Sequence, residues 1–596
     1  MQTKHFYNDP THLVVASLRG STLANPALAL DAENKIVYRR PTASDLKSPK
    51  VSIVSGGGSG HEPAFAGYVG QGLLTASVAG TIFASPSAEQ IRRCVREHVE
   101  TEKGVFMIML NYTGDVLNFG MAAEKAKAAG IKTEFFAIND DVGVGRTKGG
   151  KVGRRGIAGG ILVLKAVGAL ADAGGSLEEV ARLARFATEN TVSVASSLEH
   201  VHIPGHPLPE KAESMAHDEV EIGMGIHNEP GSHRTKADAQ TLIKTMLNQL
   251  LDQNDKDRAF LGKWSPKDKF ALLINNLGSV STLELGALTA ETCQQLKDTW
   301  KIEPVRIYQG TFLTSLNGMG FSISLLRLAD TGLGEGRQLL DLLDAPSEAT
   351  GWSAPIHKDT WNRNDWKEVE KRGEAIESAK PSNLRVNKDV LRHVLGGGLR
   401  KAIACEPKIT EYDTIVGDGD CGTGLKRGAE AILKYIESDQ ISDDIVVTLN
   451  GICQVIENTM DGTSGAVYAI FMNALTAALR SQDPATPSGT TIQSNWAPAL
   501  SSALEQLNRY TPARPGDRTL VDALAPFIDV LISTSNIHQA AKEAMDKAMA
   551  TKDLKPGLGR SVYVGGEADW IGKIPDPGAV GLAEFLLGIS EAVKGN

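Results

Sequence analysis

The hydrophobic rhythm of the chain changes after Asn383, and this change limits the kinds of domain that it can fold into. Before that point, short apolar runs alternate with helical stretches, as is typical of the buried strands of an α/β sheet. The clearest of these runs are residues 51–54, 105–110, 135–138, 271–274 and 305–308. After that point, leucines recur at helical spacing almost to the end of the chain. We therefore predict an α/β N-terminal part and an all-helical C-terminal part.

The segment between these parts, residues 351–383, has a different composition. It contains three tryptophans among charged residues and prolines, and it lacks sustained apolar periodicity. We predict that it links an α/β domain over residues 7–350 to a helical domain over residues 384–593. The tryptophans are expected to hold the linker against a surface.

Length, charge and hydropathy narrow the class of protein. The 596 residues suffice for roughly three to four domains. The net charge of −9 argues against a nucleic-acid partner and against an anionic membrane surface. The longest apolar stretch, residues 157–173, is interrupted by Lys165 and by glycines, so no membrane partner is predicted.

The two ends and the cysteines bear on location and on metal binding. Residues 1–5 contain no apolar signal core and the last residues carry no peroxisomal tripeptide, so a cytoplasmic location is expected. The five cysteines are far apart and form no Cys-x-x-Cys pair. This argues against a zinc site and against a disulfide framework.

Residues 413–424 carry the strongest chemical signal in the chain. Asp413, Asp418 and Asp420 fall within eight positions, and four glycines are threaded through the run. Carboxylates so close repel one another unless a cation lies between them, and glycines let backbone amides approach phosphate oxygens. The run therefore predicts a magnesium–nucleotide site, since Mg²⁺ prefers oxygen ligands. A solvated acidic turn or a calcium loop are the alternatives, although the spacing and closing Glu of an EF-hand are absent from the sequence.

Two glycine-rich motifs fail as nucleotide loops. Residues 145–151 match the start of a Walker phosphate loop, but Val152 stands where a Ser or Thr hydroxyl would hold Mg²⁺. A basic glycine turn is the better interpretation. Residues 56–60 follow a strand, but His61 stands where a dinucleotide fingerprint requires Gly. What remains is a glycine-rich loop that brings His61 and Glu62 to the carboxyl end of a strand.

Two further segments of the first half place reactive groups in turns. Residues 111–115 follow the strand that ends at Leu110, and they end in Asp115. Residues 221–231 present His227 in a glycine-flanked turn. Taken alone, each of the 13 histidines is more often a surface or core residue than a functional one.

Together, these motifs resemble the dihydroxyacetone kinase family in its single-chain, ATP-dependent form. The resemblance extends from about Tyr7 to Val593, and its motifs occur in the order 56–63, 111–115, 223–227 and 417–420. It implies a substrate domain made of two α/β subdomains, followed by an all-α nucleotide domain that forms an eight-helix barrel.

The resemblance also implies roles for residues in the substrate domain. His227 corresponds to the histidine that adds to the substrate carbonyl and forms a hemiaminal. Asp115 matches the acid–base position, and His61 matches the group that polarises or hydrogen-bonds the bound triose. Residues that enclose the substrate correspond to Gly58, Ser59 and Gly60. Covalent capture suits so small a substrate, because few atoms are available for non-covalent binding.

In the helical half, the resemblance assigns Asp413, Asp418 and Asp420 to two Mg²⁺ ions. The positions that contact ATP correspond to Asp418, Gly419, Asp420, Thr463, Ser464, Gly516, Arg560, Asp576, Pro577 and Gly578. Cys421 is expected to be a packed neighbour, because Mg²⁺ prefers oxygen to sulfur.

The implied reaction converts dihydroxyacetone and ATP to dihydroxyacetone phosphate and ADP, within glycerol metabolism. Glyceraldehyde is a second candidate substrate. The resemblance implies a homodimer in which the nucleotide domain of one subunit covers the substrate site of the other. Two alternatives are a lyase that splits FAD into cyclic FMN and a ligand-sensing regulator. One position departs from the family pattern: Leu110 stands where Lys is common. A Lys there is expected to improve turnover if the missing charge matters.

Overall fold

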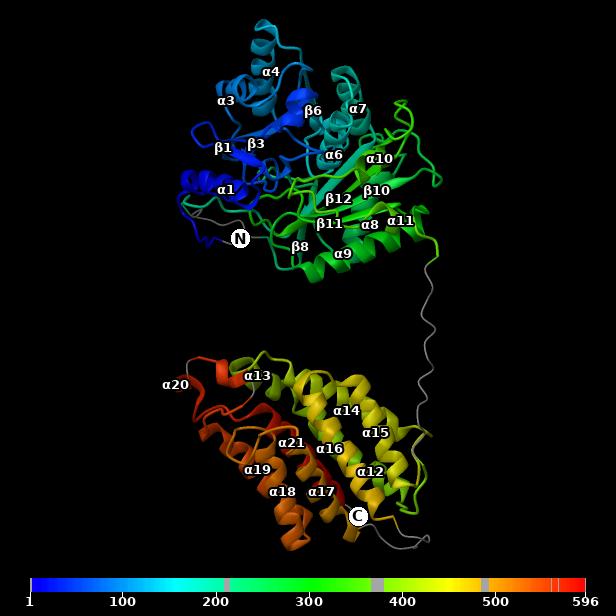
Figure 1. Ribbon diagram of the computed structural model, residues 1–596. Helices are drawn as coiled ribbons and strands as arrows, with labels where there is room; N and C mark the ends of the chain where they lie inside the picture. Colours follow the sequence, from blue (N-terminus) through cyan, green and yellow to red (C-terminus); the bar gives the residue numbers. More distant parts are fainter. Residues whose placement is uncertain are drawn as a thin grey trace. The chain divides into compact units, whose positions relative to one another are not determined.

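The computed structural model describes residues 3–207, 215–365, 380–483, 493–558, 560–565 and 567–594. It contains two compact units, unit 1 (Met1–Glu368) and unit 2 (Val369–Asn596) (Figure 1). Unit 1 mixes sheets with helices, whereas the described part of unit 2 is helical. The predicted change of fold class along the chain is therefore confirmed.

The first sheet of unit 1 has a parallel centre and an antiparallel edge. Its order is β1 (Leu28–Asp31), β2 (Ile36–Arg39), β4 (Ala76–Ile82), β3 (Ser52–Ser59), β5 (Val105–Leu110) and β6 (Thr133–Ile138). The strands from β4 to β6 run parallel, and β1 and β2 pair antiparallel. The carboxyl ends of β3 and β5, two neighbouring parallel strands, therefore meet at one edge.

The second sheet is mostly antiparallel. Its order is β11 (Arg306–Gly310), β10 (Phe270–Asn276), β12 (Gly320–Arg327), β7 (Thr191–Ser197), β8 (Glu219–Ile222) and β9 (His233–Lys236). Only β10 and β11 pair in parallel among these described strands. Each of the five apolar runs predicted as strands lies in or overlaps a strand of one of the two sheets.

The described helices of unit 1 cover the sheets. They are α1 (Pro10–Ala24), α2 (Ala43–Lys47), α3 (Ala88–Arg93), α4 (Thr113–Ala128), α5 (Arg146–Gly149), α6 (Gly159–Asp172), α7 (Leu177–Glu189), α8 (Ala239–Leu251), α9 (Thr282–Gln295), α10 (Leu339–Asp344) and α11 (Lys358–Trp361). Helix α6 contacts β3 of the first sheet and β7 and β12 of the second. Its residues are buried almost throughout, which explains its continuous apolar sequence.

The glycine run that follows residue 55 is mostly strand. We expected a loop from Gly56, but β3 continues to Ser59 and the turn begins at Gly60. A Cβ atom at Gly56 would lie 2.1 Å from the Val78 carbonyl oxygen of the neighbouring strand β4. Glycine is therefore required by the close approach of two backbones, and the strand persists in spite of its weak β-propensity.

Unit 2 is built from long helices that each pack against the next. They are α12 (Lys388–Ala404), α13 (Glu406–Val416), α14 (Cys421–Glu437), α15 (Ile445–Thr459), α16 (Gly462–Ser481), α17 (Gln493–Leu507), α18 (Val521–Thr534), α19 (Ile537–Ala550) and α21 (Pro577–Lys594). The last helix, α21, packs against the first, α12. The predicted leucine stripes lie in α12, α17, α18 and α21, and their buried members join one apolar core.

One described helix, α16, is long and apolar enough to cross a membrane when judged by length and composition alone. In unit 2 it packs against α15 and α17. Its Phe471, Leu475 and Leu479 are buried in the core of the unit.

The tryptophans in the described part of the predicted linker pack on side chains of unit 1. The Trp352 ring packs on Tyr308 and Phe312, and the Lys165 ammonium lies 5.9 Å from its centroid. The guanidinium of Arg306 lies 5.8 Å from the ring of Trp361. Residues 366–379, which include the third tryptophan, lie outside the described residues.

Candidate active site

Two histidines from different sheets face one another in unit 1. His61 follows β3, and His227 lies in the loop between β8 and β9. Their Nε2 atoms are 3.0 Å apart. The other ring nitrogen of each histidine has its own partner: His61 Nδ1 lies 2.9 Å from the Thr314 carbonyl oxygen, and His227 Nδ1 lies 2.9 Å from Glu229 Oε1.

These partners determine where the protons lie. A backbone carbonyl can only accept, so Nδ1 of His61 carries a proton and its Nε2 presents a lone pair. Burial and the positive charge of His227 both lower the pKa of His61, to about 3, so its ring is neutral at physiological pH. His227 then supplies the proton of the Nε2–Nε2 contact, and releasing that proton exposes a nucleophilic nitrogen.

Aromatic rings hold the two imidazoles in place. The Phe83 ring stacks on His61 with centroids 5.2 Å apart, and the Tyr112 ring meets His227 edge-on at 4.7 Å. Phe83 adopts a left-handed backbone conformation with φ of 60°, which is costly for a bulky residue. The Tyr112 hydroxyl donates to the Gly156 carbonyl at 3.1 Å. The orientation of His227 is therefore constrained by its ring neighbours as well as by Glu229.

Asp115 lies in the first turn of α4, directly after β5. Burial raises the pKa of this carboxyl to about 6, although a hydrogen bond from Ser85 and the positive charge of His227 lower it. Its buried Oδ1 has no hydrogen-bond partner among the described residues. A carboxylate with a raised pKa and a free oxygen can accept a proton from a bound hydroxyl.

The residues expected to enclose the substrate directly precede His61 in the sequence. Gly58 and Ser59 end β3, and Gly60 begins the turn that leads to His61. The Ser59 hydroxyl donates to the Gly80 carbonyl at 3.0 Å, and the Gly60 N–H donates to Glu62 Oε2 at 3.0 Å. Both contacts fix the path of the turn.

Leu110, at the end of β5, is buried in the core of unit 1. A Cβ atom at Gly156 or Gly160 would lie 2.8 Å from the Leu110 side chain, so this side chain is packed closely against the two glycines. We expect Leu110→Lys to lower the free energy of unfolding by about 2–5 kcal/mol, because an ammonium would be buried without a partner. Thermal unfolding measures this, with Leu110→Met as a volume-conserving control. An unchanged melting temperature with a lower KM for dihydroxyacetone would show instead that charge here reaches the substrate.

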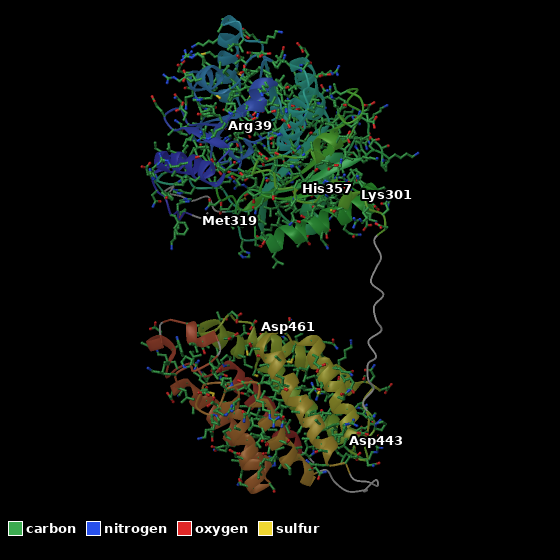
Figure 2. The ribbon with its side chains drawn as sticks, viewed as in Figure 1. Arg39, Lys301, Met319, His357, Asp443 and Asp461 are labelled. Carbon is green, nitrogen blue, oxygen red and sulfur yellow. The ribbon has the colours of Figure 1, made fainter. Side chains whose placement is uncertain are left out.

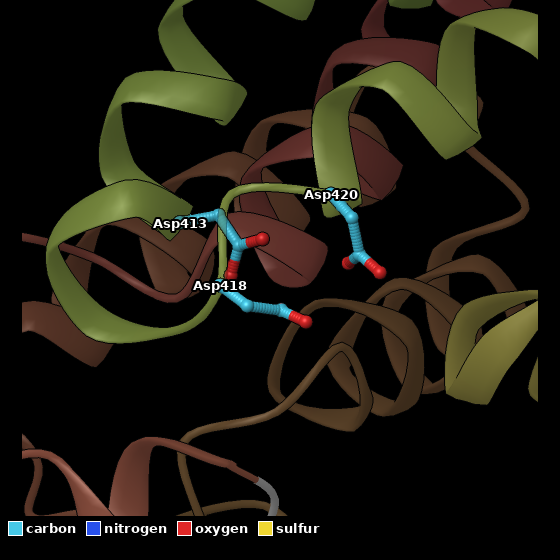
Figure 3. Close-up of side chains that lie close together, drawn as sticks. All are labelled: Asp413, Asp418 and Asp420. Atoms are coloured by element: carbon cyan, nitrogen blue, oxygen red, sulfur yellow. The ribbon is translucent and has the colours of Figure 1, made fainter. Parts of the chain in front are cut away.

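Unit 2 holds the acidic cluster that the sequence predicts. Asp413 lies near the end of α13, Asp418 in the connecting turn, and Asp420 just before α14; one oxygen of each lies within 4.8 Å of the others (Figure 3). Asp413 is buried and accepts a hydrogen bond from the Cys421 N–H at 2.9 Å. A Cβ atom at Gly417 would lie 2.2 Å from Asp413 Oδ1, so only glycine leaves this carboxylate in place. An all-oxygen set of this kind fits Mg²⁺.

Other predicted nucleotide residues lie at helix N-termini near this cluster. Thr463 and Ser464 form the first turn of α16, after Asp461 (Figure 2), and Ser464 is close enough to Cys421 to lower the pKa of its thiol, which burial raises. Asp576 precedes Pro577 and Gly578 at the start of α21. Burial raises the pKa of Asp576 to about 6, and the charges of Asp522 and Asp413 add to this, against hydrogen bonding from Ala579 and the charge of Arg518. Helix N-termini attract anions such as phosphate.

The turn that contains Gly516 is tied to the same region. The Gly516 N–H donates to Asp522 Oδ1 at 2.5 Å. Arg518 is buried, donates to the Ile574 carbonyl at 2.8 Å, and lies 4.7 Å from the Trp570 ring centroid. The Gly516 turn is thereby joined to the segment that precedes Asp576. Arg560 begins a short helical turn, but its side chain lies outside the described residues.

Several residues at the site were not singled out from the sequence. Glu229 lies two positions after His227, and Tyr112 lies inside a motif already noted, so both had a local signal. Arg518 likewise lies two positions after Gly516. Thr314 and Phe83 had no local signal, because their contacts with His61 join segments that are separate in the chain.

Comparisons with known proteins agree on one family. The Dak1 domain matches residues 19–351, and the DAK2 domain matches residues 415–591. A dihydroxyacetone kinase of Pichia angusta is 41% identical over 611 residues and covers 99% of both chains. The triokinase/FMN cyclase of Homo sapiens is 32% identical over 611 residues and covers 100% of both. The crystal structure of the C. freundii dihydroxyacetone kinase with AMP-PNP and Mg²⁺ has a TM-score of 0.59 at 29% identity, covering 99% of this chain and 100% of that chain.

Proposed function

This chain belongs to the dihydroxyacetone kinase family, and from that premise we propose that it transfers a phosphoryl group from ATP to dihydroxyacetone. The products are dihydroxyacetone phosphate and ADP. The observation that carries the proposal is the pair of histidines, His61 and His227, whose Nε2 atoms face one another at 3.0 Å. Such a pair provides a nucleophile for a carbonyl and a group that moves the released proton.

On the substrate side, His227 Nε2 adds to C2 of dihydroxyacetone and holds the triose as a hemiaminal. His61 hydrogen-bonds the oxygen formed at C2, and Asp115 accepts the proton of the hydroxyl that is phosphorylated. Gly58, Ser59 and Gly60 enclose the substrate. A bond at C2 restricts both hydroxymethyl arms and so prepares one of them for transfer.

On the nucleotide side, Asp413, Asp418 and Asp420 would hold two Mg²⁺ ions. The charge of the ATP phosphates would be neutralised there, and such neutralisation supplies much of the catalysis of phosphoryl transfer. Residues proposed to contact ATP are Asp418, Gly419, Asp420, Thr463, Ser464, Gly516, Arg560, Asp576, Pro577 and Gly578. We propose further that the ring of neighbouring helices in unit 2 is an eight-helix barrel and that the active enzyme is a cytoplasmic homodimer.

A coupled assay for ADP release tests the proposed reaction. We expect Mg²⁺-dependent ADP release that requires dihydroxyacetone and that yields dihydroxyacetone phosphate. Glyceraldehyde is expected to act as a second acceptor in the same assay. ADP release that does not depend on any triose would contradict the proposal, and triose binding without ADP release would favour a ligand-sensing role.

The raised pKa of Asp115 predicts a pH dependence. Burial raises this pKa to about 6. The carboxylate must be ionised to accept a proton, so kcat/KM is expected to be constant well above that pH and to fall about tenfold per pH unit below it. In Asp115→Asn, kcat is expected to drop by roughly 10²–10⁴-fold and this limb to vanish. A profile of the variant that retains the limb would assign it to another group.

One relative gives specific support to a second activity. The triokinase/FMN cyclase, whose name includes a flavin product, aligns with the whole chain. The same nucleotide-binding unit could split FAD into AMP and cyclic FMN. Incubation with FAD and Mn²⁺, followed by chromatography of the flavins, distinguishes the two activities. Cyclic FMN in the absence of any triose would establish the lyase reaction, and unchanged FAD would exclude it.

A further inference from the structure

Glu229 contacts His227 through both of its carboxylate oxygens. Oε1 lies 2.9 Å from the ring Nδ1, and Oε2 accepts a hydrogen bond from the His227 backbone N–H at 2.9 Å. The carboxylate therefore holds the ring and the backbone of the same residue. Neither contact was expected from the sequence.

The loop is shaped so that this carboxylate can occupy its position. A Cβ atom at Gly225 would lie 2.0 Å from Glu229 Oε2 and 2.5 Å from an Arg155 nitrogen. The Gly225 N–H donates to the Glu229 carbonyl at 2.9 Å. Asn228 has a left-handed backbone with φ of 64°, and its side chain bonds both backbone groups of Val201. Several hydrogen bonds fix the turn around His227. Of these, the hydrogen bond from Nδ1 to Glu229 is the one that involves the His227 ring.

Glu229 is ionised at neutral pH. Burial opposes ionisation, but hydrogen bonds from His227 and the positive charge of its ring lower the pKa of Glu229 to about 2. An ionised carboxylate can only accept, so the proton of this contact lies on His227 Nδ1. Once the ring has lost its other proton, the lone pair lies on Nε2, the atom that faces His61.

We propose that Glu229 is a positioning residue for substrate capture: it fixes the Nδ1–H tautomer of His227 and stabilises the positive charge of the ring in the adduct. This inference rests on the proposed capture of dihydroxyacetone at His227. A carboxylate that orients a catalytic imidazole through its Nδ1 proton plays this part in hydrolases with a Ser-His-Asp triad.

The capture step balances with Glu229 in this position. The Nε2 lone pair forms a bond to C2 of the ketone, and the π pair of the carbonyl moves onto oxygen. The proton that lay between the two Nε2 atoms passes through His61 to that oxygen, which becomes a hydroxyl. The alkylated His227 ring keeps its Nδ1 proton and carries one positive charge beside the Glu229 carboxylate.

Other charged or titratable groups also lie near His227 and contribute to the electrostatic environment of its ring. His61 and Tyr112 contact its ring, and Asp115 is close enough for the charge of His227 to lower its pKa. Although burial opposes it, the negative charge of Glu229 is one of the causes that raise the pKa of Arg155, so Arg155 is also near this site. Among the described residues, only Glu229 is hydrogen-bonded to the Nδ1 atom of His227. Removing the charge of Glu229 should therefore mainly weaken the hydrogen bond at His227 Nδ1.

Two variants of the full-length protein separate geometry from charge. Glu229→Gln keeps an oxygen that can accept from Nδ1 but removes the charge, and Glu229→Ala removes both. Asp31→Asn is the matched control, because Asp31 pairs with His98 at 3.1 Å in the first sheet and does not touch His227. Nitrogen-15 NMR of histidine-labelled protein, with His227 assigned through His227→Ala, reports the tautomer directly.

At a pH where the His227 ring is neutral, we expect wild type and Glu229→Gln to show the Nδ1–H tautomer, and Glu229→Ala to show a mixture. A merely structural role for Glu229 would leave the tautomer of His227 unchanged in Glu229→Ala.

Capture itself is read from carbon-13 NMR of dihydroxyacetone labelled at C2. Its rate and occupancy are expected to fall about tenfold in Glu229→Gln and about a hundredfold in Glu229→Ala, with Asp31→Asn unchanged. A wild-type tautomer together with wild-type capture in both Glu229 variants would overturn the proposal. If wild type itself captures no triose, the proposed function fails, and the tautomer measurement still decides whether Glu229 orients His227.

Discussion

Asp418→Ala is expected to abolish phosphoryl transfer while leaving substrate capture intact. Asp418 shares the acidic cluster of unit 2 with Asp413 and Asp420, and one carboxylate oxygen of each residue lies within 4.8 Å of the others. Loss of one ligand should cost about 4 kcal/mol of transition-state stabilisation, which corresponds to roughly 10³-fold in kcat. His227 belongs to unit 1, so the capture of dihydroxyacetone should proceed as in wild type.

The control for this variant is Asp443→Ala. Asp443 is an exposed aspartate of the same unit whose side chain lies 3.9 Å from Arg385 (Figure 2). It should retain wild-type kcat, and the binding of Mg²⁺ measured by calorimetry should be weakened only in Asp418→Ala. Wild-type turnover by Asp418→Ala in Mg²⁺ would remove this residue from the metal site.

His227→Ala is expected to lower kcat/KM for dihydroxyacetone by about 10³-fold, because the triose would lose the bond that orients it. The variant should also lose its preference for carbonyl-bearing trioses over glycerol, since glycerol has no carbonyl to capture. Steady-state kinetics with dihydroxyacetone, glyceraldehyde and glycerol measure both effects.

His233→Ala is the matched control for this variant. His233 is exposed in β9, at the end of the same loop, and its ring is hydrogen-bonded only to the neighbouring Ser232 among the described residues. Its kinetics should match wild type. Equal kcat/KM values for His227→Ala and wild type would mean that dihydroxyacetone is held without a covalent bond.

The fold class can be predicted from the sequence because buried strands and helices have recognisable patterns of apolar residues. The apolar runs that become β5 and β10 are buried on both faces, so they are continuous and easy to recognise. The path of β3 through Gly56 and Gly57 is different, because glycine disfavours strands in general. Only the approach of the β4 backbone, which no local pattern encodes, explains why the strand continues there.

The candidate site also contains some residues that can be predicted from the sequence and others that cannot. His61, Asp115 and His227 lie in glycine-flanked turns at the ends of elements, where functional side chains are expected. The partners that set their protonation come from far along the chain: 253 positions separate His61 from Thr314. Such contacts depend on how the two sheets meet, which the spacing of residues in one sequence does not specify.

Carbon-13 NMR of [2-¹³C]dihydroxyacetone, bound to protein labelled with nitrogen-15 at histidine, tests most directly whether His227 is the capture site. We predict that the C2 signal of the bound triose moves from the ketone to the tetrahedral region and shows one-bond coupling to a histidine Nε2. This coupling should be absent in His227→Ala and present in Asp418→Ala. A bound ketone signal without coupling, or coupling that persists in His227→Ala, would contradict covalent capture at His227.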